Sequence, residues 1–249
     1  MRALELTRSG IAGTIGVFVI AAVCVRLGFW QLDRREQRLE RNAALAERLA
    51  QPPHSLDGPP LDTVGLTHRR VIARGRYDNA RVLVLAGRSM AGAPGVNVLA
   101  PLRAGAGAIL VNRGWLPSRD AATVDLSAVA VDSVVTVTGV LLPLPATGTA
   151  RPDESFQTTW FRLDADPIRA QYPYPVSPLY LQAEGPDPGL RAGRGGPVPL
   201  PSPALGEGPH LSYAFQWFAF AVIFVVGWAA LVMRRGGEES GAAGTTPAD

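Results

Sequence analysis

The sequence contains no lysine, so all 24 of its basic residues are arginine. A nucleotide-composition bias of the source genome explains this absence better than a ligand does, because arginine's preference for phosphate would not remove every lysine. The net charge of +3 is spread along the chain, without a dense basic stripe that carries interleaved aromatic residues. The composition therefore argues against nucleic acid as a partner.

Cysteine and histidine are also scarce. Cys24 is the only cysteine, so the chain has no intramolecular disulfide and cannot build a thiolate zinc site or an iron–sulfur cluster by itself. The three histidines are His54, His68 and His210, and the sequence contains no HExxH, Walker or Cys/His metal motif. His54 and His68 lack any partner motif, so we interpret them as surface or turn residues.

No combination of residues indicates a catalytic centre. Residues Gly87–Ala91 (GRSMA) nearly match the nucleophile elbow G-x-S-x-G, with alanine in place of the last glycine. They lie in a strand-like context, whereas the elbow requires a strand, a turn and a helix. No histidine and aspartate can be assigned to this serine by pattern. We therefore predict that the chain is not an enzyme.

Long apolar runs occupy both ends of the chain. At about 1.5 Å per residue, the runs at residues 11–32 and 211–233 are long enough to cross a hydrocarbon core of about 30 Å as helices. A cleaved signal peptide is the alternative for the first run, but the small-residue cleavage site is missing. Arg26 lies near the end of that run, where its long side chain can reach the interface. The sequence predicts a multi-pass protein of the cell (plasma) membrane.

Arginines flank both apolar runs and predict the orientation. Arg2 and Arg8 precede the first run and Arg234–Arg235 follow the second, which favours cytoplasmic termini. We expect residues 1–10 and a disordered tail of residues 234–249 in the cytoplasm. The long central segment is expected to be extracytoplasmic, since long loops translocate largely regardless of charge.

Between the apolar runs the sequence predicts three segments. Residues 33–50 indicate a helical extension, because opposite charges recur three and four residues apart. Residues 51–184 contain short runs rich in Val, Ile, Leu and aromatic residues, bounded by Gly, Pro, Asp or Ser, which is typical of strands. Residues 185–210, dense in glycine and proline, predict an extended tether. The fold class is thus an α+β membrane protein, with two transmembrane helices flanking an antiparallel β barrel or sandwich-like domain.

His210 stands at the start of the second apolar run and is the first candidate site residue. A neutral imidazole can ligate a metal, while Tyr213 and Trp217, which follow it, favour the headgroup layer of a bilayer. On a helix the same face continues through Ala214, Ala221, Phe224 and Trp228. This mixture of small and flat side chains would accept a planar apolar ligand. An interfacial histidine in a plain membrane anchor is the alternative.

Two glutamines and one arginine complete the candidate residues. Gln31 and Gln216 lie at similar depths if both helices span, and each is adjacent to a tryptophan, Trp30 and Trp217. An interhelical amide hydrogen bond, worth about 0.6 kcal/mol, is the simplest interpretation, and contact with a ligand or partner is the alternative. Arg113 could bind a carboxylate through bidentate hydrogen bonds or form an internal salt bridge.

Five motifs resemble the surfeit locus protein family, the assembly factors of haem–copper cytochrome oxidase. They are Leu27–Arg35 (LGFWQLDRR), Arg74–Tyr77 (RGRY), Val111–Pro117 (VNRGWLP), Thr138–Leu141 (TGVL) and His210–Phe218 (HLSYAFQWF). The first, third and last are the most specific. The resemblance covers nearly the whole chain, and the chain is similar to the bacterial members of the family.

The resemblance implies a non-catalytic role in building oxidase subunit I. For bacterial members it also implies haem a binding, which can be transient, with His210 as the axial ligand of the haem iron. The ring would lie against Tyr213 and Trp217. The haem propionates would meet arginines, and the candidates are Arg34, Arg35 and Arg113.

Other expectations from the resemblance concern partners. Subunit I, haem a synthase and the lipid bilayer are the expected partners, and Trp30, Gln31 and Gln216 are the residues expected in partner or interhelical contacts. A haem-free membrane scaffold that stabilises nascent subunit I is the alternative function. The family often has asparagine just before the histidine, where this chain has Glu207, Gly208 and Pro209, so an asparagine side chain that could support the histidine would be absent.

Overall fold

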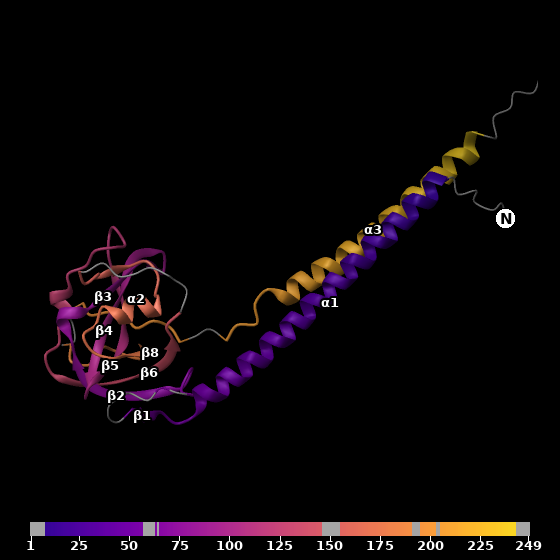
Figure 1. Ribbon diagram of the computed structural model, residues 1–249. Helices are drawn as coiled ribbons and strands as arrows, with labels where there is room; N and C mark the ends of the chain where they lie inside the picture. The colour runs from indigo at the N-terminus through magenta and orange to yellow at the C-terminus, as the bar shows by residue number, and fades with distance from the viewer. Residues whose placement is uncertain are drawn as a thin grey trace, which may run out of the picture. The chain divides into compact units, whose positions relative to one another are not determined.

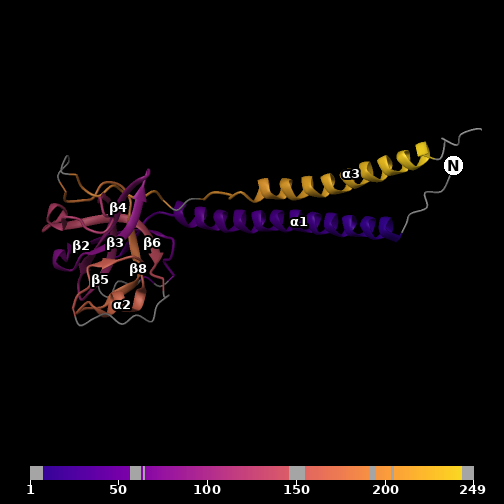
Figure 2. The same cartoon turned by 90° about the horizontal axis from the view of Figure 1, so that it is seen from above.

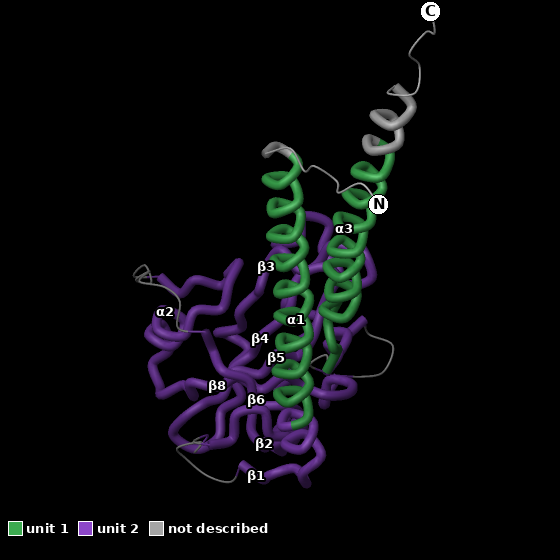
Figure 3. Tube along the Cα trace, turned by 90° about the vertical axis from the view of Figure 1, so that its right-hand side faces the viewer, with its two compact units in different colours: residues 1–43, 205–249 green, residues 44–204 purple. Residues whose placement is uncertain are grey.

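The computed structural model describes residues 8–56, 63, 65–145, 155–190, 195–202 and 205–242. The chain forms two compact units, which Figure 3 shows in different colours. The first unit comprises residues 1–43 and 205–249, and the second comprises residues 44–204.

Two long helices form most of the first unit, α1 (Arg8–Ala50), which belongs to it up to residue 43, and α3 (His210–Ala242). Both are long and apolar enough to cross a membrane. Only 11% and 6% of their most apolar windows are buried, whereas the core helix of a soluble protein would be mostly buried. Their apolar side chains are therefore available to lipid, as the sequence predicts for two membrane helices.

The two helices lie side by side (Figures 1 and 2) and pack small residues against aromatic rings. A Cβ at Gly28 would come within 2.5 Å of the Phe218 ring, and a Cβ at Gly13 within 2.3 Å of the Trp228 ring. Between these two contacts lies a small buried cluster of Ala21, Cys24 and Ala221. Small residues allow close approach of helix backbones, the main way in which helices associate within lipid.

The second unit contains a β barrel with strands added outside it. Its strands are β1 (His54–Leu56), β2 (Arg70–Tyr77), β3 (Leu83–Met90), β4 (Ala93–Ala104), β5 (Gly107–Pro117), β6 (Val134–Pro143), β7 (Thr159–Trp160) and β8 (Val176–Ala183). The sheet order is β1-β2-β6-β8-β5-β4-β3-β7, and a further pairing of β2 with β4 closes the ring. The expectation of a barrel is therefore confirmed.

The barrel is not wholly antiparallel, contrary to the sequence-based expectation. β5 and β8 pair in parallel, as do the short pairs β1–β2 and β3–β7. Parallel neighbours need a long crossover connection, and the chain between β5 and β8 supplies one. This connection includes β6, β7 and the short helix α2 (Ala165–Ala170).

The central strands β4 and β5 are buried along most of their length, because apolar residues cover both of their faces. The larger core cluster fills the barrel and includes Val98, Val111 and Leu181. The second cluster includes Leu99 and Leu110 from the other face of these strands, together with Ile168 of α2. Strands covered on both faces have continuous apolar runs instead of alternating ones.

The Gly/Pro-rich segment after β8, which the sequence predicts as an extended tether, makes several contacts with the second unit. Val198 forms an isolated antiparallel bridge with Trp115, with N···O distances of 2.8 and 2.7 Å. Leu190 packs against the main core, and the side chain of Gln182 donates a hydrogen bond to the Pro201 carbonyl. The described parts of residues 185–202 therefore dock on the domain, although they contain no helix or strand.

Candidate histidine site

α3 begins at His210 because the two preceding residues turn the chain into the helix. Gly208 has φ +73°, a conformation that glycine adopts without a steric penalty. The Pro209 carbonyl accepts a hydrogen bond from the Tyr213 amide at 3.1 Å. The turn places the imidazole of His210 in the first position of the helix, on the side that faces α1.

The imidazole forms a hydrogen bond with Gln31 of α1. Its Nδ1 atom lies 2.9 Å from the Gln31 Oε1 atom. An amide oxygen only accepts hydrogen bonds, so this contact makes Nδ1 the donor, and in the neutral imidazole Nε2 is then the nitrogen with the lone pair. Metal-ligating histidines are commonly oriented in this way by an acceptor on the other ring nitrogen. In this arrangement Nε2 is the ring nitrogen that could ligate a metal.

Gln31 is the first member of a polar stripe on α1 that also contains Arg35, Arg38 and Asn42. Residues spaced by three or four lie on one face of a helix. Gln31 contacts the first residue of α3, and the other three side chains contact the segment that leads into α3. The partners of the last three are the Glu207 carboxylate (3.0 and 2.6 Å), the Gly206 carbonyl (2.6 Å) and the Leu205 carbonyl (2.9 Å). We call these four residues the polar clasp.

The polar clasp changes the interpretation of the two glutamines. Gln31 does form an interhelical hydrogen bond, but its partner is His210 and not Gln216. Gln216 is exposed, because it lies off the face of α3 that Ala214 and Ala221 turn toward α1. Sequence reasoning predicted residues 33–50 only as a helical extension and assigned no contacts to Arg38 and Asn42. Their spacing from Gln31 was the signal that could have revealed them.

The aromatic face of α3 is largely used for helix packing, so the expectation that it would accept a planar ligand needs correction. Ala214 and Ala221 are only 1% and 7% exposed, and the Trp228 indole donates to the Thr14 hydroxyl of α1 at 3.1 Å. Trp217 is half-buried against the cluster around Ala221. Of this face, Tyr213 and Phe224 remain exposed.

A shallow depression on α1 offers a second apolar surface in this unit. Its volume is about 310 Å³, and it is lined by Arg26, Leu27 and Trp30. Leu27 lies one helical turn before Gln31. Arg34 stacks on the Trp30 ring, with its guanidinium carbon 5.6 Å from the ring centroid, and donates to Gln37 at 3.2 Å. Among the expected propionate contacts, Arg34 has no carboxylate partner among the described residues, whereas Arg35 is paired with Glu207.

Arg113 has the internal salt bridge that was the alternative to a ligand contact. Its Nε atom lies 2.6 Å from the Asp187 Oδ2 atom, and the two side chains are 0% and 3% exposed. The guanidinium also stacks on the Tyr77 ring at 4.5 Å. Burial raises the pKa of Asp187 and that of Tyr77. Sequence reasoning did not identify Asp187, because it lies in the segment that resembled a tether.

Comparisons with known proteins find relatives that match most of the chain. A family model described as the SURF1 family matches residues 18–222. A SURF1-like protein of Monosiga brevicollis is 28% identical over 235 residues, covering 89% of this chain and 88% of that protein. A SURF1-like protein of Rickettsia felis is 25% identical over 218 residues, covering 84% and 92%. Surfeit locus protein 1 of Mus musculus is 22% identical over 236 residues, covering 88% and 75%.

Proposed function

We infer the function from one premise: the chain belongs to the SURF1 family. We propose that it is an assembly factor for haem–copper cytochrome c oxidase that binds haem a and assists its insertion into subunit I, with His210 as the axial ligand. The observation that carries this proposal is the hydrogen bond between His210 Nδ1 and Gln31 Oε1, which leaves Nε2 able to ligate iron.

The donor set suits a metal that arrives with ligands of its own. Across the described residues, no group of three or more His, Cys, Asp or Glu side chains could hold a bare metal ion. Haem iron needs only an axial ligand from the protein, which a neutral imidazole supplies. Haem a would supply the redox-active iron of the oxidase, and the residues of this chain would bind and orient it.

Several residues around His210 would bind and orient the haem, each in a different way. Gln31 orients the imidazole, and the exposed Tyr213 offers an aromatic surface beside it. Trp30 and Leu27 line the apolar depression on α1. The exposed Arg34 is the arginine best able to meet a propionate, because Arg35 already pairs with Glu207.

A haem-free scaffold for nascent subunit I is the second candidate function, and one observation favours it. Two of the three arginines expected to meet propionates already have carboxylate partners, namely Arg35 with Glu207 and Arg113 with Asp187. In this second function, the two helices contact subunit I and the His210–Gln31 hydrogen bond contributes only to helix packing.

We further propose that the protein lies in the plasma membrane with cytoplasmic termini and an extracytoplasmic barrel. The arginines that flank both apolar runs support this orientation. In that arrangement His210 stands at the extracytoplasmic surface. Subunit I and haem a synthase are the proposed partners there.

Complementation of a cell that lacks this protein tests the proposal. We expect His210→Ala to leave subunit I in the membrane but to lower the haem a content of the oxidase several-fold. His54→Ala, an exposed histidine of β1, serves as the matched control and should restore the wild-type haem content. Oxidase with full haem a content in the His210→Ala strain would contradict haem delivery and favour the scaffold.

A further inference from the structure

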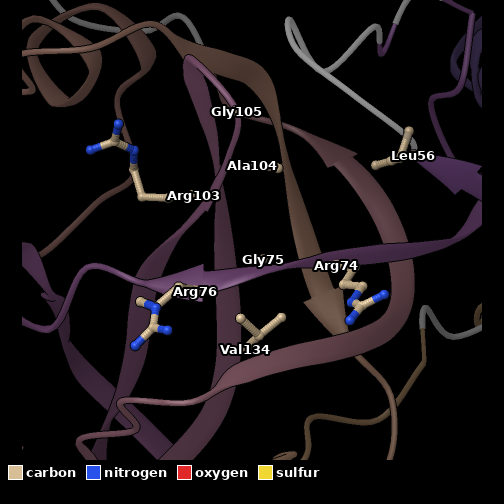
Figure 4. A pocket seen from close by; sticks show the side chains of 8 residues that line it. All are labelled: Leu56, Arg74, Gly75, Arg76, Arg103, Ala104, Gly105 and Val134. Carbon is tan, nitrogen blue, oxygen red and sulfur yellow. The ribbon is translucent and has the colours of Figure 1, made fainter.

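A depression of about 440 Å³ opens in the second unit where one edge of β2 is only partly paired (Figure 4). β1 pairs with β2 at Val71–Ala73, and β4 pairs with it at Arg76 and Tyr77. Arg74 and Gly75 lie between these two pairings. The end of β1, the end of β4 and the start of β6 surround the gap, and the proposed oxidase function does not involve this region.

Three arginines line the depression, and none of the described residues that line it is acidic. Arg74 and Arg76 flank Gly75 on β2, and Figure 4 shows Val134 between their side chains. Arg103 of β4 is the register partner of Arg76. Like charges directly opposite each other on paired strands are destabilising. The fold therefore tolerates a concentration of positive charge that a bound anion would relieve.

Neutral groups hold two of these guanidinium groups in place without neutralising them. Arg76 donates to the backbone carbonyl of Asp132, and Arg103 stacks on the Tyr174 ring at 4.0 Å. The ion pairs among the described residues include none of the three arginines. By contrast, Arg70, earlier on the same strand, pairs with Glu184 at 2.9 Å.

Gly75 explains how the arginines come together. A Cβ at this position would lie 2.2 Å from the Arg103 carbonyl oxygen, so a larger residue would force β2 away from β4. Glycine lets the two strands meet, which brings the backbone of Arg103 beside the two arginines that flank Gly75, while Figure 4 shows the Arg103 side chain turned away from theirs. The motif Arg74–Tyr77 thus closes the barrel and also builds a basic surface.

We propose that this depression binds an organic phosphate. Arginine donates paired hydrogen bonds to phosphate oxygens, and a phosphate ester, whether a monoester or a lipid diester, spreads its negative charge over several oxygens, so that more than one arginine can bind it at once. The volume far exceeds that of a phosphate group, and Leu56, Ala104 and Val134 supply an apolar part of the lining. The ligand is therefore a phosphate joined to an organic body, either a lipid headgroup or a soluble phosphate ester.

The test uses the full-length protein, with Arg74→Gln/Arg76→Gln as the pocket variant. Arg119→Gln/Arg162→Gln removes the same charge from exposed arginines outside the depression and is the control. One arm titrates detergent-purified protein with glycerol 1-phosphate by calorimetry. The other arm measures by native mass spectrometry whether phosphatidylglycerol or phosphatidylcholine stays bound after extraction from nanodiscs. Circular dichroism checks that both variants fold.

We expect the pocket variant to bind the phosphate probe at least about tenfold more weakly than the wild type, while the control variant binds it like the wild type. If the pocket variant loses glycerol 1-phosphate binding in the calorimetric arm, the ligand is a soluble phosphate ester. If it loses only the bound phosphatidylglycerol, the ligand is a lipid headgroup. Either result supports the proposal. Equal binding by the pocket variant and the control, or no binding of any probe by the wild type, overturns it.

Discussion

Arg113 is the largest fully buried side chain of the described residues, and it forms a buried ion pair with Asp187. Removing one member of a buried ion pair leaves an uncompensated charge, which typically costs about 3–5 kcal/mol. We therefore expect Asp187→Asn to lower the free energy of unfolding by about that amount. Urea denaturation followed by far-ultraviolet circular dichroism measures it.

A double substitution separates the charge from the packing at this position. Replacing a whole buried ion pair with apolar residues is often neutral or stabilising. Arg113→Met/Asp187→Leu should therefore be more stable than Asp187→Asn alone. If the double variant were the less stable of the two, the salt bridge would not be the reason for the loss.

Asp120 provides a pH-dependent contribution to stability in the loop after β5. Its carboxylate accepts four hydrogen bonds, from the Ser118 hydroxyl, the Ala122 amide, and the amide and hydroxyl of Thr123. These bonds hold the pKa of Asp120 well below its ordinary value of 3.8. Because the folded pKa is below the unfolded one, the stabilisation is complete above about pH 4 and is lost as the pH falls further.

The corresponding measurement compares the wild type with Asp120→Asn by urea denaturation at a series of pH values. The difference in unfolding free energy should be constant above about pH 4 and should shrink steadily at lower pH. A difference that stays constant into strong acid would show that the Asp120 charge does not stabilise the loop.

Gln31 is expected to determine which nitrogen of His210 carries the proton. In the haem-free, full-length protein labelled with ¹⁵N-histidine, the wild type should show the Nδ1–H tautomer at His210. Gln31→Leu removes the acceptor, so the signal should shift toward the Nε2–H tautomer that predominates in water. Gln216→Leu, the same change at an exposed position of α3, is the control and should leave the signal unchanged. If the tautomer of His210 is unchanged in Gln31→Leu, Gln31 does not orient the imidazole.

At the scale of elements, contact between α1 and α3 depends on Gly28. A Cβ there meets the Phe218 ring, whereas nothing lies within 4 Å of one at Gly16. Overpacking of a tight contact typically costs about 1–3 kcal/mol, so Gly28→Ala should weaken the helix pair and Gly16→Ala should not. Cys24, buried in the same interface, reports the separation through its reaction with a thiol-specific dye during heating.

We expect the Gly28→Ala protein to react with the dye at a temperature several degrees lower than the wild type and Gly16→Ala. Since Cys24 is the only cysteine, the signal comes from this interface alone. Equal reaction temperatures for the two glycine variants would mean that Phe218 moves aside without cost and that Gly28 is not required for packing.

The helices and strands could be predicted from the sequence better than the contacts between them. Both apolar runs are helical, and the apolar segments of residues 51–184 form strands, because the hydrophobic pattern determines these structures locally. The pairing of β5 with β8 depends on a crossover that brings distant residues together, which no local pattern encodes. His210 was found from its position, but its partner is 179 residues away, and so Gln31 was matched with Gln216 instead.

At the scale of the whole molecule, the segment between β8 and α3 is fastened at both of its ends. Asp187 and Val198 attach it within the second unit, and Arg35, Arg38 and Asn42 hold Leu205–Glu207 within the first. His210 therefore follows an anchored segment. Hydrogen bonds to backbone carbonyls contribute most of this second attachment, so substitution of Glu207 alone should leave the segment in place.

The central claim is that His210 ligates haem a, and the most direct measurement is an absorbance spectrum. The full-length protein is purified in detergent from cells that synthesise haem a, beside the His210→Ala and His54→Ala variants. The account predicts a Soret band with haem a features in the wild type and in His54→Ala, and its loss in His210→Ala. A colourless wild-type protein that folds and co-purifies with oxidase subunit I, or an undiminished band in His210→Ala, would contradict it.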